Sequence, residues 1–160
     1  MRQTLSLAKS YPTSLHREDL QWLVDAVPDF FKTDFINNTL NIRFEQHDIT
    51  LPGELPLDHY DLCFADFVLH HIWYDEGGPM ESTLTELAIG EMVRLARPGG
   101  LIAIREIEAM TGRAALDFRT LFAKYPLHKV LDEAERLQDG QVVTLVYSKT
   151  IRPFVIEGTA

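Results

Sequence analysis

Apolar residues recur at helical spacing in the segment from Glu81 to Gly100, ESTLTELAIGEMVRLARPGG. Counted from the first of them, they stand at offsets of 0, 3, 4, 8 and 11, which places them on one face of a helix. Pro98 ends the pattern, and Gly99 and Gly100 supply the turn after it. The spacing therefore predicts a long amphipathic helix whose apolar face consists of Leu84, Leu87, Ala88, Met92 and Leu95.

Other segments have the patterns of strands. Residues 62–69, LCFADFVL, form an apolar run without alternation, which is typical of a parallel strand buried on both faces. LIAIREI at residues 101–107 is a second apolar strand, and LNIRFEQHDI at residues 40–49 alternates apolar and polar side chains. Two strand-like segments close the chain, at residues 141–150 and 151–158, and they predict a C-terminal antiparallel hairpin.

The remaining patterns predict helices. Residues 5–11 have the spacing of a short amphipathic helix, residues 20–36 form a second helix with a kink or break at a proline, and helical sequence returns at residues 113–137. Residues 13–19 fit either a short strand or the start of the second helix. This alternation predicts an α/β fold with an open, mostly parallel sheet flanked by helices on both faces. The connections are short, so we expect a single domain over residues 1–160.

Composition narrows the functional classes. The chain has 160 residues, 46% of them hydrophobic, and a formal net charge of −9, which disfavours binding to nucleic acid or to anionic membranes. No apolar stretch reaches the ~20 residues of a membrane span. The single Cys63 lies in the most apolar run as a small hydrophobic residue and fits a reducing, cytoplasmic setting. Residues 1–17 have the composition of an organelle transit peptide, although an ordinary amphipathic helix is the plainer interpretation.

Two adjacent histidines, His70 and His71, follow the apolar run. Neighbouring residues diverge in a strand or a helix, and the sequence has no HExxH, CxxC or His-x-His spacing, so no metal site is expected. Open α/β sheets bind ligands beyond the carboxyl ends of their strands, where a histidine is suited to act as a general base. The alternative is that both histidines only join the strand to the next loop.

Three segments in sequence order carry a family resemblance. They are FEQHDITLP at residues 44–52, YDLCFADFVLHHI at residues 60–72 and EMVRLARPGGLIAIRE at residues 91–106. In this order and at about these intervals they resemble the class I S-adenosylmethionine-dependent methyltransferases, especially the branch that acts on small molecules. The resemblance implies a Rossmann-like fold, S-adenosylmethionine as cofactor and a small-molecule substrate.

The resemblance also assigns site residues. Asp48 takes the position that approaches the adenine amino group, with Ile49 beside the ring. Ala65 and Asp66 lie where the strand faces the methionine end of the cofactor. The remaining assignments are Glu18 or Asp19 as the ribose-binding acid, and His70 or His71 near the methyl acceptor as catalytic residues.

The family's first strand and its glycine-rich cofactor loop, of the GxGxG type, have no counterpart in the sequence. Residues 2–12 resemble the helix that follows that loop, so we expect a domain truncated at its amino end, with weaker cofactor binding. In the family's strand order, 3-2-1-4-5-7-6, the missing strand is central, and its loss opens an edge beside the strand at residues 60–69. Three outcomes are open: the neighbouring strands close up, a second copy or partner chain inserts a strand, or the early segment refolds.

Three functions remain open at this point. The first is a methyltransferase in which the chain positions a small acceptor for in-line attack and a histidine takes its proton. The second is a non-catalytic methyltransferase-like subunit that binds a partner chain through the exposed sheet edge. The third is a methyltransferase fold reused for a cyclisation or an isomerisation.

Overall fold

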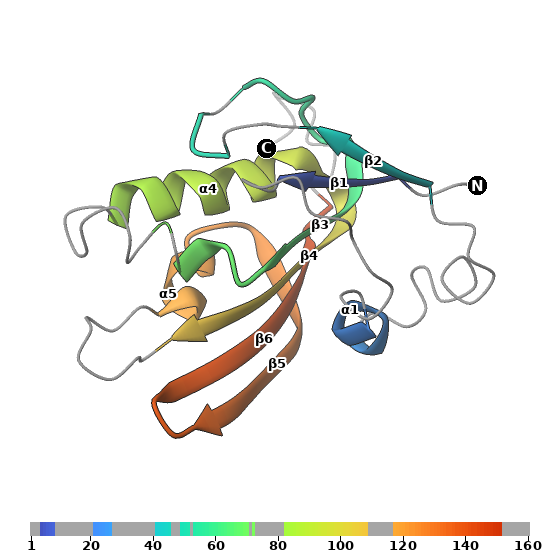
Figure 1. The fold of residues 1–160 in the computed structure, drawn as a ribbon. Coiled ribbons are helices and arrows are strands. Elements are labelled where there is room, and N and C mark those ends of the chain that lie inside the picture. The colour runs from blue at the N-terminus through green and yellow to red at the C-terminus, as the bar shows by residue number, and fades with distance from the viewer. Residues whose placement is uncertain are drawn as a thin grey trace, which may run out of the picture.

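A four-stranded mixed sheet forms the centre of the fold (Figure 1). The structure is a computed structural model that describes residues 4–8, 21–26, 41–45, 49–51, 53–70, 72, 82–108 and 117–151. The strands are β3 (Tyr60–Asp66), β4 (Ala96–Glu108), β5 (Leu127–Leu137) and β6 (Gly140–Lys149). They stand in the order β3-β4-β6-β5, with β3 and β4 parallel and β6 antiparallel to both of its neighbours. The predicted α/β sheet is confirmed, although its pairing is only partly parallel.

Helices cover both faces of this sheet. α4 (Ser82–Leu95) and α5 (Phe118–Phe122) pack on one face, and α1 (Gln21–Ala26) packs on the other (Figure 1). Successive strand residues point to opposite faces, so each strand contributes to two cores. The α4 side buries Cys63, Ile102, Ile104 and Leu145 with Ile89 and Phe122. The α1 side buries Leu62, Ala103 and Val146 with Leu23 and Val24.

The helix predicted from apolar spacing is confirmed by α4. α1 confirms part of the helix predicted at residues 20–36, and the rest of that segment lies outside the described residues. Among the helices that the structure describes, none has both the length and the apolar character needed to cross a membrane.

Two short parallel strands, β1 (Thr4–Ala8) and β2 (Asn41–Glu45), form a second sheet. β2 confirms the strand predicted at residues 40–49, whereas the helix predicted at residues 5–11 is wrong for the part that β1 occupies. TLSLA alternates leucine with polar residues at a period of two, and pairing along β2 favours the strand. β1 also approaches β3, with Cα–Cα distances of 8 Å or less.

β5 corrects a second helix prediction. The segment at residues 127–137 contains helix-favouring side chains such as Glu133 and Arg136, yet it forms an antiparallel ladder with β6 along its whole length. β6 is rich in β-branched and aromatic residues, so pairing with it outweighs the local preference of its partner. Within the described part of residues 113–137, only α5 is helical.

An antiparallel hairpin ends the described part of the chain. β6 confirms the first of the two predicted strands, at residues 141–150, and the second, at residues 151–158, lies almost entirely outside the described residues. The hairpin joins β5 to β6 through Gln138 and Asp139, and residues 152–160 lie outside the described residues. β5 is the outer strand of the sheet, where charged side chains and a bulge between Lys129 and Leu131 disfavour pairing with another chain. Dimerisation through a sheet edge stays a prediction, and the β5 edge is poorly suited to it.

Gly100 lies where the start of β4 comes very close to other backbone atoms. A Cβ atom there would lie 2.8 Å from the carbonyl oxygen of Arg97 and 3.1 Å from those of Tyr60 and Asp61. The preceding Gly99 has a φ of +78°, a backbone conformation that residues other than glycine rarely adopt. The residues predicted to form the turn, Pro98–Gly100, lie inside β4, where the register with β3 shifts between Tyr60 and Leu62.

We expect Gly100→Ala to lower the free energy of unfolding by about 1–3 kcal/mol, because backbone atoms must move to make room for the methyl group. Urea denaturation followed by circular dichroism measures the loss. Gly90→Ala in α4 is the control, since its one close neighbour is the movable hydroxyl end of Tyr125. Equal stability of Gly100→Ala and the parent chain would contradict the close approach.

Candidate functional site

The chain turns sharply after Asp66, at the carboxyl end of β3. Phe67 has a φ of 53°, a left-handed conformation that is uncommon for a bulky residue, and its N–H donates to the carbonyl oxygen of Arg105 at 2.8 Å. His70 follows in a short helical turn, so the strand predicted at residues 62–69 ends at Asp66. Backbone strain of this kind costs on the order of 1–3 kcal/mol and clusters at functional sites.

A fully buried carboxylate from β4, that of Glu106, holds this turn. Its Oε1 accepts hydrogen bonds from the N–H groups of Val68 and Leu69, both at 2.8 Å, and its Oε2 accepts one from the N–H of His70 at 3.3 Å. Nδ1 of the His70 ring lies 2.8 Å from the same Oε2. An ionised carboxylate accepts about four hydrogen bonds, so these N–H groups satisfy its capacity.

Glu106 also fixes the orientation of the His70 ring. A carboxylate only accepts hydrogen bonds, so Nδ1 of the neutral imidazole donates to Glu106 and Nε2 is the basic nitrogen. His70 is 7% exposed, and the Phe67 ring packs against it edge to face, with 6.2 Å between centroids. The pair is suited to take up a proton, because the carboxylate stabilises the charged imidazolium that results.

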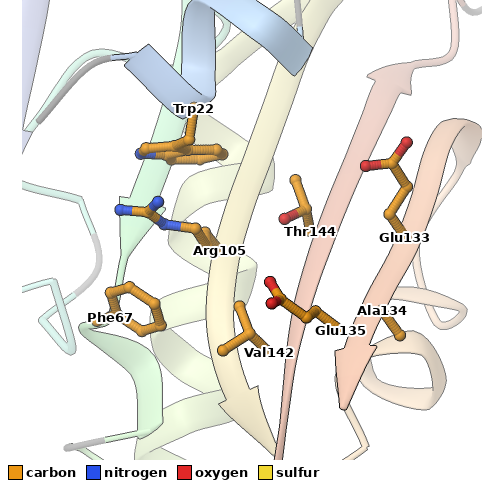
Figure 2. Close-up of a pocket in the computed structure, with 8 residues that line it drawn as sticks. All are labelled: Trp22, Phe67, Arg105, Glu133, Ala134, Glu135, Val142 and Thr144. Atoms are coloured by element: carbon orange, nitrogen blue, oxygen red, sulfur yellow. The ribbon is translucent and has the colours of Figure 1, made fainter. Parts of the chain in front are cut away.

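On the opposite face of β4, Arg105 joins β3 to α1. Its guanidinium forms a bidentate pair with Asp66, with Nε 2.8 Å from Oδ1 and Nη2 3.0 Å from Oδ2. The same group lies 5.2 Å from the centroid of the Trp22 ring and 4.8 Å from that of Phe67. Figure 2 shows it between the two rings. The bidentate pair and the two cation–π contacts together hold α1 and the turn after β3 against one strand.

A groove of about 630 Å³ opens beside Arg105 on the α1 side of the sheet (Figure 2). Trp22 and Phe67 line one end, and Glu133 and Glu135 of β5 line the other. This volume lies within the range of about 300–1,000 Å³ that small-molecule sites occupy. The remaining lining residues are Ala134 of β5 and Val142 and Thr144 of β6.

The residues predicted for the site are only partly covered by the structure. Asp66 and His70 flank the turn after β3, Ala65 is buried in the core on the α4 side, and Ile49 packs against that core. The roles predicted for these residues stay predictions. The others, which lie outside the described residues, are Glu18, Asp19, Asp48 and His71.

Cys63 does not contribute a nucleophile. Burial raises the pKa of its thiol to about 12, so the thiol stays protonated at neutral pH and behaves as the small hydrophobic residue that the sequence suggested. In the part of the chain that the structure describes, no group of three or more His, Cys, Asp and Glu side chains is placed to hold a metal ion.

A second charged cluster surrounds Arg119 of α5, beyond the end of β4. Its guanidinium lies 3.0 Å from Oε1 of Glu108 and 2.7 Å from Oδ1 of Asp132, and the Gln141 amide donates to Glu108 at 2.7 Å. Hydrogen bonds from Arg119 and then from Lys129 lower the pKa of Asp132 to about 2. The cluster ties α5 to three strands and is accounted for by this structural role.

Comparison with known proteins identifies the fold. No protein-family model and no curated protein sequence matches the chain, but 227 chains of solved structures do. The N-methyltransferase NodS from Bradyrhizobium japonicum WM9 aligns at a TM-score of 0.57 and 15% identity, over 94% of this chain and 74% of NodS. The 1,6-didemethyltoxoflavin-N1-methyltransferase from Burkholderia thailandensis aligns at 0.54 and 16% identity, over 94% of this chain and 62% of the enzyme. The chain has a methyltransferase fold.

The resemblance seen in the sequence is thus confirmed at the level of fold. The order β3-β4-β6-β5 matches the 4-5-7-6 half of the methyltransferase sheet. A protein of different activity shares the likeness: the [4+2]-cyclase SpnF aligns at a TM-score of 0.52 and 14% identity, over 82% of this chain and 64% of SpnF. At such identities the methyltransferase fold does not by itself fix the reaction.

Sequence reasoning missed Arg105 and Glu106, which stand side by side in LIAIREI. That segment was interpreted as an apolar strand, and its two charges were given no role. A signal was present, because charged residues in a strand buried on both faces require partners. The partners themselves become visible only once β3 and β4 are placed in register.

Proposed function

We propose that the chain is an S-adenosylmethionine-dependent methyltransferase domain that acts on a small molecule. The fold supports this, and two neighbours, NodS and the Burkholderia enzyme, have been determined with S-adenosylhomocysteine bound. The observation that carries the proposal is the buried His70–Glu106 pair, which follows the carboxyl end of the parallel strand β3. That end of an open α/β sheet is where ligands bind.

In this proposal His70 accepts the proton that the acceptor loses on methylation. Glu106 acts through His70 as a positioning residue, since it keeps Nδ1 protonated and the ring in one orientation. A general base of this kind contributes about 10²–10⁴-fold to the rate, and positioning of the acceptor contributes further. His71 remains the alternative base.

S-adenosylmethionine, when bound, supplies an electrophilic methyl group on a sulfonium sulfur. In this proposal Ile49 and Ala65 contact its apolar parts, since both are apolar and each stands beside an acidic residue in the sequence. Asp66 keeps acceptor capacity beyond its two hydrogen bonds to Arg105. The full set proposed for the cofactor is Glu18 or Asp19, Asp48, Ile49, Ala65 and Asp66.

The proposal extends to the central part of the sheet. β1 pairs with β2 and approaches β3, so residues 4–8 would take the place of the family's first strand. The sequence offers no GxGxG loop to follow it, and the backbone N–H groups of such a loop contribute much of the cofactor's binding. Cofactor binding should therefore be weak.

Calorimetric titration with S-adenosylhomocysteine tests the cofactor part. We expect saturable binding with a Kd of up to about 1 mM, which corresponds to about −4 kcal/mol. Homocysteine alone, which lacks the adenosine, is the matched control ligand. The cofactor part of the proposal fails if S-adenosylhomocysteine gives no heat of binding at millimolar concentration.

The catalytic part is tested by transfer of a radiolabelled methyl group to a panel of small amines, phenols and carboxylic acids. His70→Asn should reduce transfer by about 10²-fold or more while S-adenosylhomocysteine binding is retained. His128→Asn on the exposed face of β5 is the control and should leave transfer unchanged. Equal transfer by the two variants would exclude His70 as the base.

A cyclisation or isomerisation on the same fold is the second candidate, and the likeness to the cyclase SpnF favours keeping it. It predicts cofactor binding without label transfer to any acceptor. Mass analysis distinguishes the two, because cyclisation and isomerisation leave the substrate mass unchanged whereas methylation raises it.

A further inference from the structure

A row of polar side chains crosses the α1 side of the sheet at the level of Asp66. Asp66 is the cross-strand partner of Arg105, Arg105 that of Thr144, and Thr144 that of Glu133. Residues in register on neighbouring strands point to the same face, so these side chains form one line across four strands. The adjacent row is apolar and consists of Phe64, Ala103, Val146 and Leu131.

The groove described above follows this polar row from α1 to β5. Figure 2 shows Arg105 between the Trp22 and Phe67 rings, and Glu135 extending from β5 across β6 towards it. Glu133 and Glu135 are exposed, and neither carboxylate has a hydrogen bond or ion pair with any residue that the structure describes. The groove therefore combines an aromatic end with an end that carries two unpaired negative charges.

The balance of charges in the groove favours a cation. Asp66 neutralises Arg105 through both of its oxygen atoms, and the two rings enclose the guanidinium. No comparable partner among the described residues neutralises Glu133 and Glu135, and the chain as a whole has a formal charge of −9. A concave surface with an excess of one sign of charge raises the local concentration of ligands of the opposite sign.

We propose that the groove binds a small organic cation such as an amine or an amidine. The charged end of the ligand lies at Glu133 and Glu135, and its apolar body lies against Val142 and the Trp22 and Phe67 end. The volume of about 630 Å³ admits a small metabolite with a ring or a short chain. The inference is independent of methyl transfer, since it needs only the sheet face and α1, and binding alone tests it.

Benzamidinium and benzamide are matched probes, because they share size and shape and differ in charge. The sequence has two tryptophans, so a Trp73→Phe background leaves the emission of Trp22 as the reporter at the groove. We expect benzamidinium to quench this emission with a Kd in the low millimolar range and benzamide to bind at least about tenfold more weakly.

The double variant Glu133→Gln/Glu135→Gln should raise the Kd of benzamidinium by about tenfold, and added salt should raise it in the parent chain. The control, Glu54→Gln/Glu86→Gln, removes two charges from residues that do not line the groove and should leave the Kd unchanged, with all variants folded by circular dichroism. Equal affinity for benzamidinium and benzamide would overturn the proposal. The proposal would also be overturned if benzoate bound more tightly than benzamidinium, or if benzamidinium did not bind at about 10 mM. An equal effect of the two double variants on the Kd of benzamidinium would overturn it as well.

Discussion

Replacing Glu106 by glutamine should lower the free energy of unfolding by about 1–3 kcal/mol for each buried N–H group that loses its acceptor. The side chain is fully buried, and both of its oxygen atoms accept N–H groups from the turn after β3. A glutamine side chain has an NH₂ group in place of one carboxylate oxygen, and this group faces N–H donors that it cannot accept. At least one buried N–H group therefore loses its acceptor. Urea denaturation measures the loss.

Glu133→Gln makes the same chemical change on the exposed face of β5 and should shift the free energy of unfolding by less than about 0.5 kcal/mol. His70→Asn separates the two tasks of Glu106, because it removes the ring contact and keeps the three backbone hydrogen bonds. If the main task of Glu106 is to hold the backbone of the turn, His70→Asn should lower the free energy of unfolding clearly less than Glu106→Gln does. A Glu106→Gln protein as stable as the parent chain would contradict the role given to this carboxylate.

The elements that sequence reasoning predicted well are those whose pattern is long and local. α4 has apolar residues at helical spacing along most of its length, and the apolar runs at residues 62–65 in β3 and 101–104 in β4 are too short for helices. Burial on both faces of the sheet follows from such runs, since consecutive apolar side chains of a strand point to opposite faces. For these elements the local sequence pattern is enough to predict the structure, without knowledge of the segments with which they pack.

The wrong secondary-structure predictions concern segments whose conformation depends on pairing with a strand that is distant in the sequence. Residues 127–137 favour a helix locally, but β6 offers a long strand with which they pair. Residues 4–8 have too few apolar positions to separate a period of two from one of 3.6, and β2 decides the outcome. In both cases a ladder of backbone hydrogen bonds, which the side-chain pattern does not report, outweighs the local preference.

The candidate site shows the same division. His70 was predicted from its place after an apolar strand, and its role stays a prediction, whereas its partner Glu106 belongs to the next strand of the sheet. Asp66 was predicted to face the cofactor, and its bidentate partner Arg105 was not foreseen. Both partnerships depend on the parallel register of β3 with β4, and consecutive residues of β4 then serve opposite faces of the sheet.

The second large effect is expected at Arg105, where Arg105→Met should lower the free energy of unfolding by about 2–4 kcal/mol. The substitution removes a bidentate pair worth about 1.5–3 kcal/mol and two cation–π contacts of about 0.5–1 kcal/mol each, and it leaves the half-buried Asp66 without this partner. Methionine retains the apolar stem, so the loss reports the guanidinium rather than a cavity. Denaturation by urea measures it, and the emission of Trp22 should shift to longer wavelength as α1 loosens.

The matched control is Arg136→Met at an exposed position of β5, which should change stability by less than about 0.5 kcal/mol. A double-mutant cycle with Asp66→Asn isolates the ion pair, and a coupling of about 1.5–3 kcal/mol is expected. If Arg105→Met leaves both stability and Trp22 emission unchanged, the guanidinium does not anchor α1. Loss of stability without a change in emission would instead confine its role to the turn after β3, because Trp22 is the residue through which α1 contacts Arg105.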